Sequence, residues 1–320
     1  MEARDIITSS RLATSGSRRL EAPSRRYGEK AIKGLLGVCA ALSVAVTTAI
    51  VISLIGPSIG FFQEVPVGDF LFGTTWSPSI EPQSFGALPI VVGTLNVTLW
   101  GLLFAIPIGL GAAIYLSEYA SPRARRTLKP ILEVLAGVPT VAFGFFAFSF
   151  ITPLLQDIWP GFLGDEPNIF NAGAAGLAIG LLIVPIIASI SEDAMSAVPG
   201  GLREGAYALG ASRMRVALRV VFPAALSGIV ASIVLGVSRA VGETMVVLMA
   251  AGSTPNLTFS PIDSIQAMTA YIGVTATGDI ATGTIEYDTI FAVGLLLFAM
   301  TLVMNLISIR LVRRYREVYE

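Results

Sequence analysis

Residues 199–223 read PGGLREGAYALGASRMRVALRVVFP, a charged stretch that is punctuated by glycines. It lies between two strongly apolar runs, near 171–191 and 220–250. Each run reaches the length of about 20 apolar residues that a helix needs to cross a bilayer. We therefore expect the stretch to be a polar connection between two membrane-spanning helices.

The composition of the whole chain indicates that the lipid bilayer is its solvent. Of the 320 residues, 54% are apolar and 13% are charged, and the mean hydropathy is +0.75. A soluble domain carries about 25% charged residues. Period-two alternation is absent and the apolar runs are too long for barrel strands, so the sequence predicts helices. Six runs are long enough to span, near 34–62, 86–117, 131–156, 171–191, 220–250 and 287–309.

The basic residues predict the orientation, because Lys and Arg favour the cytoplasmic side of a membrane. All 21 lie before the first span, in the second connection, in residues 199–223 or after the last span, except Arg239 inside the fifth. In the other three connections every charged residue is Asp or Glu. Both termini and residues 199–223 are therefore expected in the cytoplasm. Residues 1–33 are expected to be a disordered Arg- and Ser-rich tail, 34–316 the six-helix domain and 317–320 a cytoplasmic C-terminus.

The residue inventory excludes several kinds of chemistry. The chain has no His and a single cysteine, Cys39 in the first span, which argues against a transition-metal site, an internal disulfide and a His-dependent triad. No Gly-Lys dipeptide occurs, so the phosphate-cradling loop of ATPases is absent from the sequence. We therefore predict no catalytic residue, metal or cofactor on this chain, and no nucleic-acid partner.

The skeleton of residues 199–223 resembles the EAA loop of ABC-importer permeases, which reads Glu-Ala-Ala, three residues, Gly, nine residues, then Ile-x-Leu-Pro. Every spacing fits, and the departures at Gly205, Val220 and Phe222 are small or apolar. The resemblance implies the type I permease fold, an all-α membrane protein of six transmembrane helices. It implies a cytoplasmic coupling helix, in a loop of about 192–223, that docks into a separate ATPase. The residues implied in this coupling are Arg203, Glu204, Gly205, Ala206 and Gly210.

Two ionisable residues interrupt the fifth apolar run. Arg239 and Glu243 are spaced i,i+4, so on a helix they lie on one face about one turn apart. An ionised side chain at the bilayer centre costs about 2.5–3.5 kcal/mol on insertion scales and usually faces a cavity. The pair is either a packing device or a site for an oxyanion, which the arginine fork binds through two hydrogen bonds. We favour the oxyanion site.

Three threonines are further candidates for a substrate path. Thr94 and Thr98 lie four residues apart in the second span and share a helical face. Thr140 follows Gly137 and Pro139, which are expected to kink or break the start of the third span. Small residues also allow close helix packing in membranes. For Thr94 and Thr98 the packing and path-lining roles stay open, and for Gly137 and Pro139 packing is favoured.

The segment that holds the ion pair sharpens the resemblance to phosphate-specific permeases, and to their C subunit. Residues 238–245, SRAVGETM, are similar to that family's Arg-Ala-x-Gly-Glu-Thr segment in the fifth helix. Residues 85–95 and 107–119 are similar to the entry and the exit of its second helix. The similarity runs from about residue 35 to 315, and FGALP at 85–89 separates the C subunit from the related A subunit.

This resemblance implies a role and a set of partners. The chain is expected to be a translocation subunit in a bacterial inner membrane, where it spans the bilayer several times in contact with membrane lipids. A second, A-type permease would complete the pore as a heterodimer. A cytoplasmic ATPase dimer would supply the ATP and Mg chemistry, and an extracytoplasmic phosphate-binding protein would deliver the substrate.

Other functions are compatible with parts of the sequence. A permease for sulfate, molybdate or an amino acid would keep the EAA loop but would not need the pair of Arg239 and Glu243. The A-type phosphate subunit shares part of the motifs. A passive anion channel would need no docking loop, and a membrane enzyme would need a reactive cluster where this chain offers scattered carboxylates.

Overall fold

The computed structural model describes residues 27–161 and 164–314. The expected C-terminus 317–320 and residues 1–26 of the expected tail lie outside this part. Within it the elements are helical, apart from two strands of two residues, β1 (Trp76–Ser77) and β2 (Ser84–Phe85), which pair antiparallel. The prediction of an all-α membrane protein is confirmed.

The chain divides into two units, residues 1–50 and 51–320. The long apolar helix α1 (Tyr27–Glu64) begins in the first unit and ends in the second. In the first unit its residues 29–50 are all exposed, and their apolar side chains are those of a lipid-facing helix. In the second unit Phe61, near the end of α1, is buried against Phe70 and Phe85.

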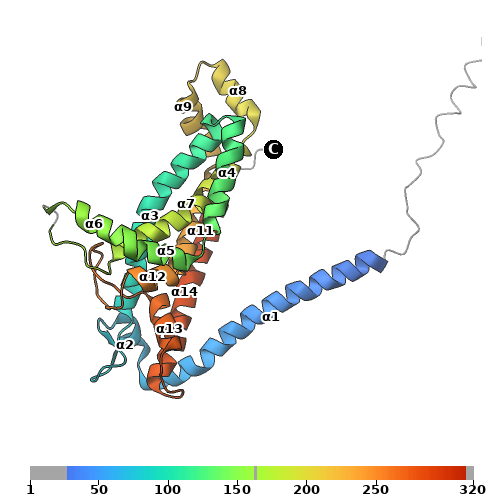
Figure 1. Cartoon of the computed structure of the whole chain (residues 1–320). Helices are drawn as coiled ribbons and strands as arrows, with labels where there is room; N and C mark the ends of the chain where they lie inside the picture. Colours follow the sequence, from blue (N-terminus) through green and yellow to red (C-terminus); the bar gives the residue numbers. More distant parts are fainter. Residues whose placement is uncertain (1–26, 162–163, 315–320) are drawn as a thin grey trace, which may run out of the picture. The chain divides into compact units, whose positions relative to one another are not determined.

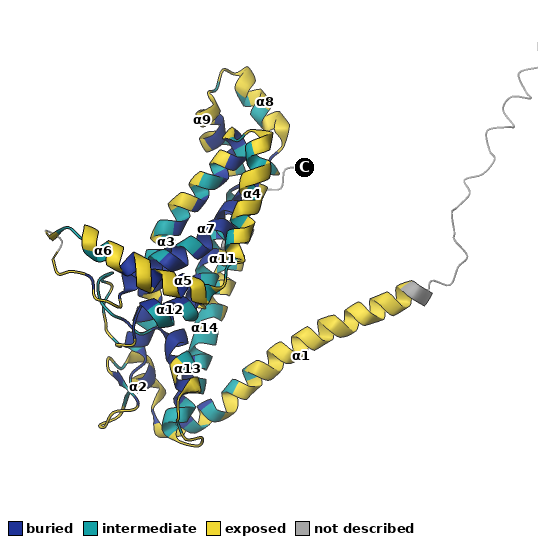
Figure 2. Ribbon diagram, in the orientation of Figure 1, coloured by how far each residue is buried: buried dark blue, intermediate teal, exposed yellow. Residues whose placement is uncertain are grey.

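Two helices, α3 (Leu88–Ile114) and α7 (Ala172–Ser196), form the centre of the second unit (Figures 1 and 2). They pack along their lengths, and α7 is buried through most of its own. The close approach depends on glycines, because a Cβ on Gly180 would lie 2.9 Å from the Gly101 carbonyl oxygen and 2.8 Å from the Phe104 ring. Small residues allow this kind of contact between helices in membranes.

The remaining long helices pack around this centre. α11 (Leu226–Val241) lies against α7, and α14 (Ile285–Arg314) packs on α11 and on α13 (Met268–Thr277). The shorter elements are α2 (Val67–Phe72), η2 (Tyr115–Tyr119), α4 (Pro122–Ala136), α5 (Thr140–Phe146), η3 (Ala147–Ile151), α6 (Thr152–Ile158), α8 (Gly200–Ala208), α9 (Arg213–Val216), η5 (Ala217–Val221), α10 (Phe222–Ala224) and α12 (Met245–Ala250). The η elements are π-helical turns.

Five described helices are long and apolar enough to cross a membrane, and a sixth span is formed if one bent pair counts as one. That pair, Arg213–Ala224 and Leu226–Val241, bends by 73°. The third span begins at Thr140 and not at 131, because α4 ends at Ala136 and the chain breaks at Gly137–Pro139 as expected. The fifth run is not one helix over 220–250: it bends at Ala225 and breaks after Val241.

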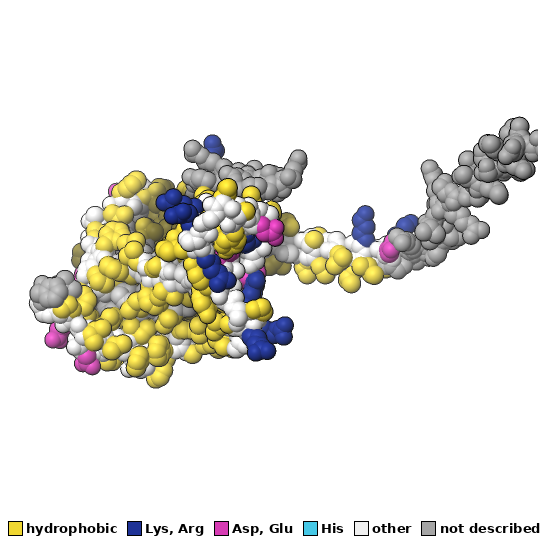
Figure 3. All heavy atoms as spheres, turned by 90° about the horizontal axis from the view of Figure 1, so that it is seen from above, with side chains coloured by type: hydrophobic (Ala, Val, Ile, Leu, Met, Phe, Trp, Pro, Cys, Tyr) yellow, Lys and Arg dark blue, Asp and Glu magenta, His cyan; other side chains and the backbone are white. Residues whose placement is uncertain are grey.

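The two ends of the second unit differ in charge. α8 and α9 lie at one end, and Lys and Arg side chains gather there when the chain is seen from above (Figures 1 and 3). α2 and the β1–β2 hairpin lie at the other end, beside the carboxylates of Glu64 and Asp69. The separation matches the expected distribution of bases and acids, and the sidedness of the termini stays a prediction.

Candidate functional site

The predicted ion pair lies at the end of α11, where the helix stops inside the fifth apolar run. α11 ends at Val241, and three residues connect it to α12. Arg239 Nη1 donates a hydrogen bond to Glu243 Oε2 at 2.5 Å. The two side chains therefore meet across a helix end, whereas the sequence predicted a pair along one continuous helix.

Glu243 is a buried carboxylate whose charge is compensated on both sides. Its side chain is 3% exposed, and one oxygen accepts from Arg239. The other oxygen accepts from the backbone N–H groups of Met245 and Val246, in the first turn of α12, at 3.2 and 3.4 Å. Its backbone carbonyl accepts from the hydroxyl of Thr269 at 2.7 Å. A buried charge needs such partners, so the position of Glu243 is fixed.

Arg239 differs from its partner because it is partly exposed. Its side chain is 38% exposed and lines a groove of about 600 Å³ between α4, α7 and α11. The other polar side chains in this groove are Glu133, Ser189 and Ser238, beside apolar residues such as Pro185 and Leu235. A guanidinium has five N–H donors, and one of these on Arg239 is directed at Glu243. The remaining donors can bind an oxyanion in the groove.

Thr94 has a clear packing role. It is 3% exposed, its hydroxyl donates to the Ile90 carbonyl at 2.8 Å, and its Oγ1 accepts from the Met268 N–H at 3.0 Å. Met268 opens α13, and the next residue, Thr269, donates to the Glu243 carbonyl. The first turn of α13 therefore joins Thr94 on α3 to the helix break beside the ion pair.

The other two threonines lie apart from the groove. Thr98 is 5% exposed and donates to the Thr94 carbonyl at 2.7 Å. Thr140 is half-buried and begins α5, which packs on α12. None of the three threonines lines the groove of Arg239. The packing alternative accounts for Thr94 and Thr98, and the path-lining role stays a prediction without support from their surroundings.

The expected coupling segment forms a short helix, α8, followed by a turn. Glu204 and Gly205 are exposed on α8, and Ala206 is half-buried. Gly210 has a φ of +81°, which an L-residue rarely adopts, and an added Cβ there would meet open space. The glycine is thus needed for the turn itself. Beside it, the Leu209 side chain is 91% exposed.

Arg203 does not face outward with the other coupling residues. Its guanidinium donates to Glu118 Oε1 from Nε at 3.2 Å and from Nη2 at 3.0 Å. It also donates to the carbonyls of Val198 and Met195 at 2.6 and 2.7 Å. These bonds commit its head group to this chain, and the coupling role of Arg203 stays a prediction.

Two buried carboxylates were missed by the sequence reasoning. Glu118 pairs with Arg203, and Glu192, whose side chain is fully buried, pairs with Arg125 and Lys129 of α4. Burial lowers the pKa of Lys129, but its hydrogen bonds to Asp193 and Glu192 and their charges outweigh this and raise the pKa above its ordinary value. The sequence did contain a signal for them: each acid directly follows an apolar run, Glu118 after 86–117 and Glu192 after 171–191, and each adjoins a connection that carries Lys or Arg.

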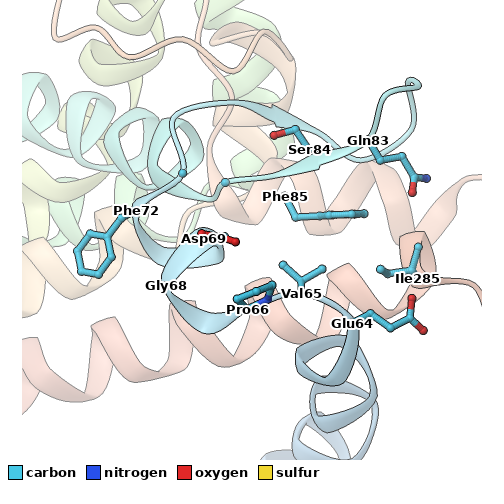
Figure 4. Close-up of a pocket in the computed structure, with 12 residues that line it drawn as sticks. Glu64, Val65, Pro66, Gly68, Asp69, Phe72, Gln83, Ser84, Phe85 and Ile285 are labelled. Atoms are coloured by element: carbon cyan, nitrogen blue, oxygen red, sulfur yellow. The ribbon is translucent and has the colours of Figure 1, made fainter.

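A second groove, of about 610 Å³, lies at the opposite end of the unit, between the end of α1, α2 and β2 (Figure 4). Glu64, Asp69 and Ser84 are among its polar side chains, and Phe72 lies at its edge. It contains none of the predicted site residues. Among the described residues, no group of three acidic or sulfur side chains is arranged to hold a metal ion.

Comparisons with known proteins agree with this architecture. The family described as "Binding-protein-dependent transport system inner membrane component" matches residues 105–317. This range contains the candidate coupling segment, the groove of Arg239 and α14, and it begins within α3.

Similar proteins cover nearly the whole chain. A probable ABC transporter permease protein, YqgH, of Bacillus subtilis is 32% identical and aligns with 91% of this chain and 91% of its own length. The phosphate transport system permease protein PstC of Haemophilus influenzae is 33% identical over 90% of this chain and 94% of that protein. PstC of Pasteurella multocida is 35% identical over 78% of this chain and 80% of its own length.

Solved structures support the same fold. A subunit of a bacterial alginate ABC transporter, crystallised with a periplasmic protein, aligns with 91% of this chain and 98% of its own length, with a TM-score of 0.59 and 17% identity. A subunit of the inward-facing MetNI methionine ABC transporter aligns with 72% of this chain and 95% of its own length, with a TM-score of 0.52 and 21% identity. The chain belongs to the family of inner-membrane permease components of binding-protein-dependent ABC transport systems.

Proposed function

We propose that this chain is the translocation subunit of an ATP-driven importer of inorganic phosphate. One observation carries the substrate assignment: Arg239 is half-exposed in a groove while Glu243, its buried partner, occupies only one side of its guanidinium. The relatives from Haemophilus influenzae and Pasteurella multocida that cover most of the chain are phosphate transport permeases, which supports the same substrate.

The geometry suits a path that must bind an anion and then release it. A planar guanidinium binds two oxygens of a tetrahedral oxyanion at once. An arginine without a counter-charge would hold a phosphate dianion too tightly for rapid release. Glu243 offsets part of the charge of Arg239, and two backbone N–H groups of α12 fix the carboxylate in place. The site therefore favours moderate and reversible binding.

The coupling segment supplies the energy input in this proposal. Glu204, Gly205 and Ala206 lie on α8 at the basic end of the second unit, and Gly210 forms the turn that follows. The exposed apolar side chains of Leu202, Tyr207 and Leu209 provide a surface for a partner. A cytoplasmic ATPase dimer would dock here, and it would bind and hydrolyse ATP with Mg on its own chains.

The proposal includes two further partners. An A-type permease would complete the path as a heterodimer, because a groove on one chain is open on one side. An extracytoplasmic phosphate-binding protein would deliver phosphate to the acidic end of the chain. Both termini would lie in the cytoplasm, and the chain would alternate between inward-open and outward-open states as ATP is bound and hydrolysed.

Uptake of radiolabelled phosphate tests the function directly. Cells that lack this gene should lose high-affinity uptake, and the gene on a plasmid should restore it. Excess unlabelled sulfate or molybdate should leave the restored uptake unchanged, whereas phosphate should compete. Sulfate competition would point to another oxyanion, and uptake that persists after ATP depletion would point to a passive channel.

A further inference from the structure

The side chain of Arg203 links three segments of the chain. It projects from α8 and forms four hydrogen bonds, two to Glu118 and one each to the carbonyls of Met195 and Val198. Glu118 belongs to η2, which continues α3, and the two carbonyls belong to the last turn of α7 and the residues after it. One guanidinium thus ties the coupling helix to the ends of both central helices.

The partners of Arg203 depend on it. The Glu118 side chain is 5% exposed, and among the described residues its other donor is the neighbouring Ser117 hydroxyl at 2.9 Å. A buried carboxylate without a cation is strongly destabilised. The last carbonyls of a helix lack intrahelical partners and carry partial negative charge, which a cation satisfies. A lysine cannot replace the planar fork, because its ammonium is a compact point charge.

The other contacts of α8 are weaker. Every residue of α8 is half-buried or exposed, and Ala206 supplies a small apolar contact with the buried cluster around Val198 and Val216. The backbone bond from Ala211 to the Ala206 carbonyl, at 3.1 Å, stays within the loop itself. Arg203 is therefore the main polar connection between α8 and the membrane-spanning helices.

The helices that Arg203 reaches continue to the groove of Arg239. α7 packs on α11, where the hydroxyls of Ser191 and Ser232 lie 2.8 Å apart and both are buried. Gly236 of α11 lies against Ile183, whose Cγ2 would be 2.8 Å from an added Cβ. Since such a contact leaves little room for sliding, a movement of the end of α7 displaces the helix that carries Arg239.

We infer that Arg203 and Glu118 are positioning residues that transmit the movement of α8 into α3 and α7. The inference rests on the proposed function, in which an ATPase docks on α8. Arg203 does not touch the ATPase in this scheme. It makes α8 and the two central helices move as one body, so that ATP hydrolysis and the opening of the groove stay linked.

The test uses the complete transporter in proteoliposomes, with the second permease, the ATPase and the phosphate-loaded binding protein. Three quantities are measured: co-purification of the ATPase, ATP hydrolysis and phosphate uptake. The variants are Arg203→Met, Arg203→Lys and Glu118→Gln. The matched control is Arg123→Ala, which removes an exposed arginine at the same end of the second unit as α8.

We expect Arg203→Met to retain the ATPase and to hydrolyse ATP, while the ratio of phosphate imported to ATP hydrolysed falls about tenfold, within the range of coupling between sites. Arg203→Lys and Glu118→Gln should give smaller losses of the same ratio, because each keeps part of the network. Arg123→Ala should keep the wild-type ratio. The split between hydrolysis and uptake is a result that loss of stability alone does not produce.

Three outcomes would overturn the inference. If Arg203→Met loses the ATPase, Arg203 is a docking contact. If the variants accumulate poorly but the remaining protein keeps the wild-type ratio of phosphate imported to ATP hydrolysed, the network only stabilises the fold. If Arg203→Met does not accumulate at all, the ratio is measured on Arg203→Lys instead. If the wild-type chain binds no ATPase, the proposed function fails together with the inference, which separates that failure from the other two.

Discussion

Arg239 and Glu243 are bonded across the end of α11, where the helix stops two residues after the arginine. The break gives the two charges different environments: the carboxylate is enclosed by the first turn of α12, and the guanidinium faces a groove. An ion pair within a continuous helix would have placed both side chains on one surface. The helix end therefore lets one member be structural while the other is available to a substrate.

The first prediction concerns this division of roles. Arg239→Gln keeps a side chain of similar length but removes the charge, so phosphate uptake should fall at least about tenfold, the effect of losing one charge-assisted hydrogen bond of about 1.5–3 kcal/mol. Protein abundance and ATPase binding should be retained, because the glutamine amide can still donate a hydrogen bond to Glu243. Arg239→Lys should restore uptake in part, because a point charge lacks the fork. Uptake assays and immunoblots of membranes measure these effects.

The packing alternative for the pair predicts a different pattern. Removing only Arg239 would leave Glu243 buried without its cation. Losing one partner of a buried ion pair costs about 3–5 kcal/mol of stability, and the cost here should lie at the lower end because Arg239 is partly exposed. The protein would then be lost from the membrane. The double change Arg239→Met with Glu243→Leu would restore abundance and also transport. Normal phosphate transport by that double variant would contradict the substrate role.

The second prediction separates two threonines that the sequence treats alike. Thr94→Val leaves the Met268 N–H buried without an acceptor, which should lower the free energy of unfolding by about 1–3 kcal/mol. Thr98→Val removes only a donor to a carbonyl of its own helix, so the loss should be about 0.5–1 kcal/mol. Thermal unfolding in detergent measures both. Uptake per molecule should stay normal in each variant, and a selective loss of uptake in Thr98→Val would restore its path-lining role.

The spans, the break at Gly137–Pro139 and the turn at Gly210 were predictable because each depends on local sequence. Apolar length determines a span, proline breaks a helix and glycine allows a positive φ. The break after Val241 was not predictable, since the bonds that hold Glu243 come from α12 and α13, which lie further along the chain. The inward direction of Arg203 was not predictable either, because its bonds to Glu118 and to the end of α7 join segments that are distant in the sequence.

The third prediction concerns pH. The raised pKa of Lys129 means that the folded chain holds this proton more tightly than the unfolded chain. The stabilisation by Lys129 is therefore complete below the unfolded pKa and is lost as the pH rises through the folded pKa, which lies above the ordinary value for a lysine. The melting temperature of Lys129→Met should lie below that of the wild type by a constant amount from about pH 6 to 9. A difference that shrinks within this range would contradict the assignment.

The fourth prediction tests the turn that ends α8. Gly210→Ala adds a methyl group that has room, but it forces an L-residue into a φ of +81°, at a cost of about 1–2 kcal/mol. The turn should shift, and ATPase co-purification and uptake should fall together. Gly201→Ala is the control, because an added Cβ there also meets open space and Gly201 lies within α8 with an ordinary φ. Gly210→Ala with wild-type ATPase binding and uptake would show that this turn is not used in coupling.

The fifth prediction concerns sidedness. Lys and Arg side chains gather at the end of the second unit that holds α8, and they favour the cytoplasm, so α8 should lie inside the cell. A reporter that is active only outside the cytoplasm should give signal when fused after Phe72 or Gly278 and none after Arg125 or Arg215. Fusions after Phe72 and Arg125 enclose α3, and those after Arg215 and Gly278 enclose α11, α12 and α13, so each pair tests whether the chain crosses once between its two sites. Opposite signals after Arg215 and Gly278 would show that the fifth run crosses the membrane once, although it is bent at Ala225 and broken after Val241. Signal after Arg215 would place α8 outside, where no ATPase can reach it, and the coupling role of α8 and of Arg203 would be wrong.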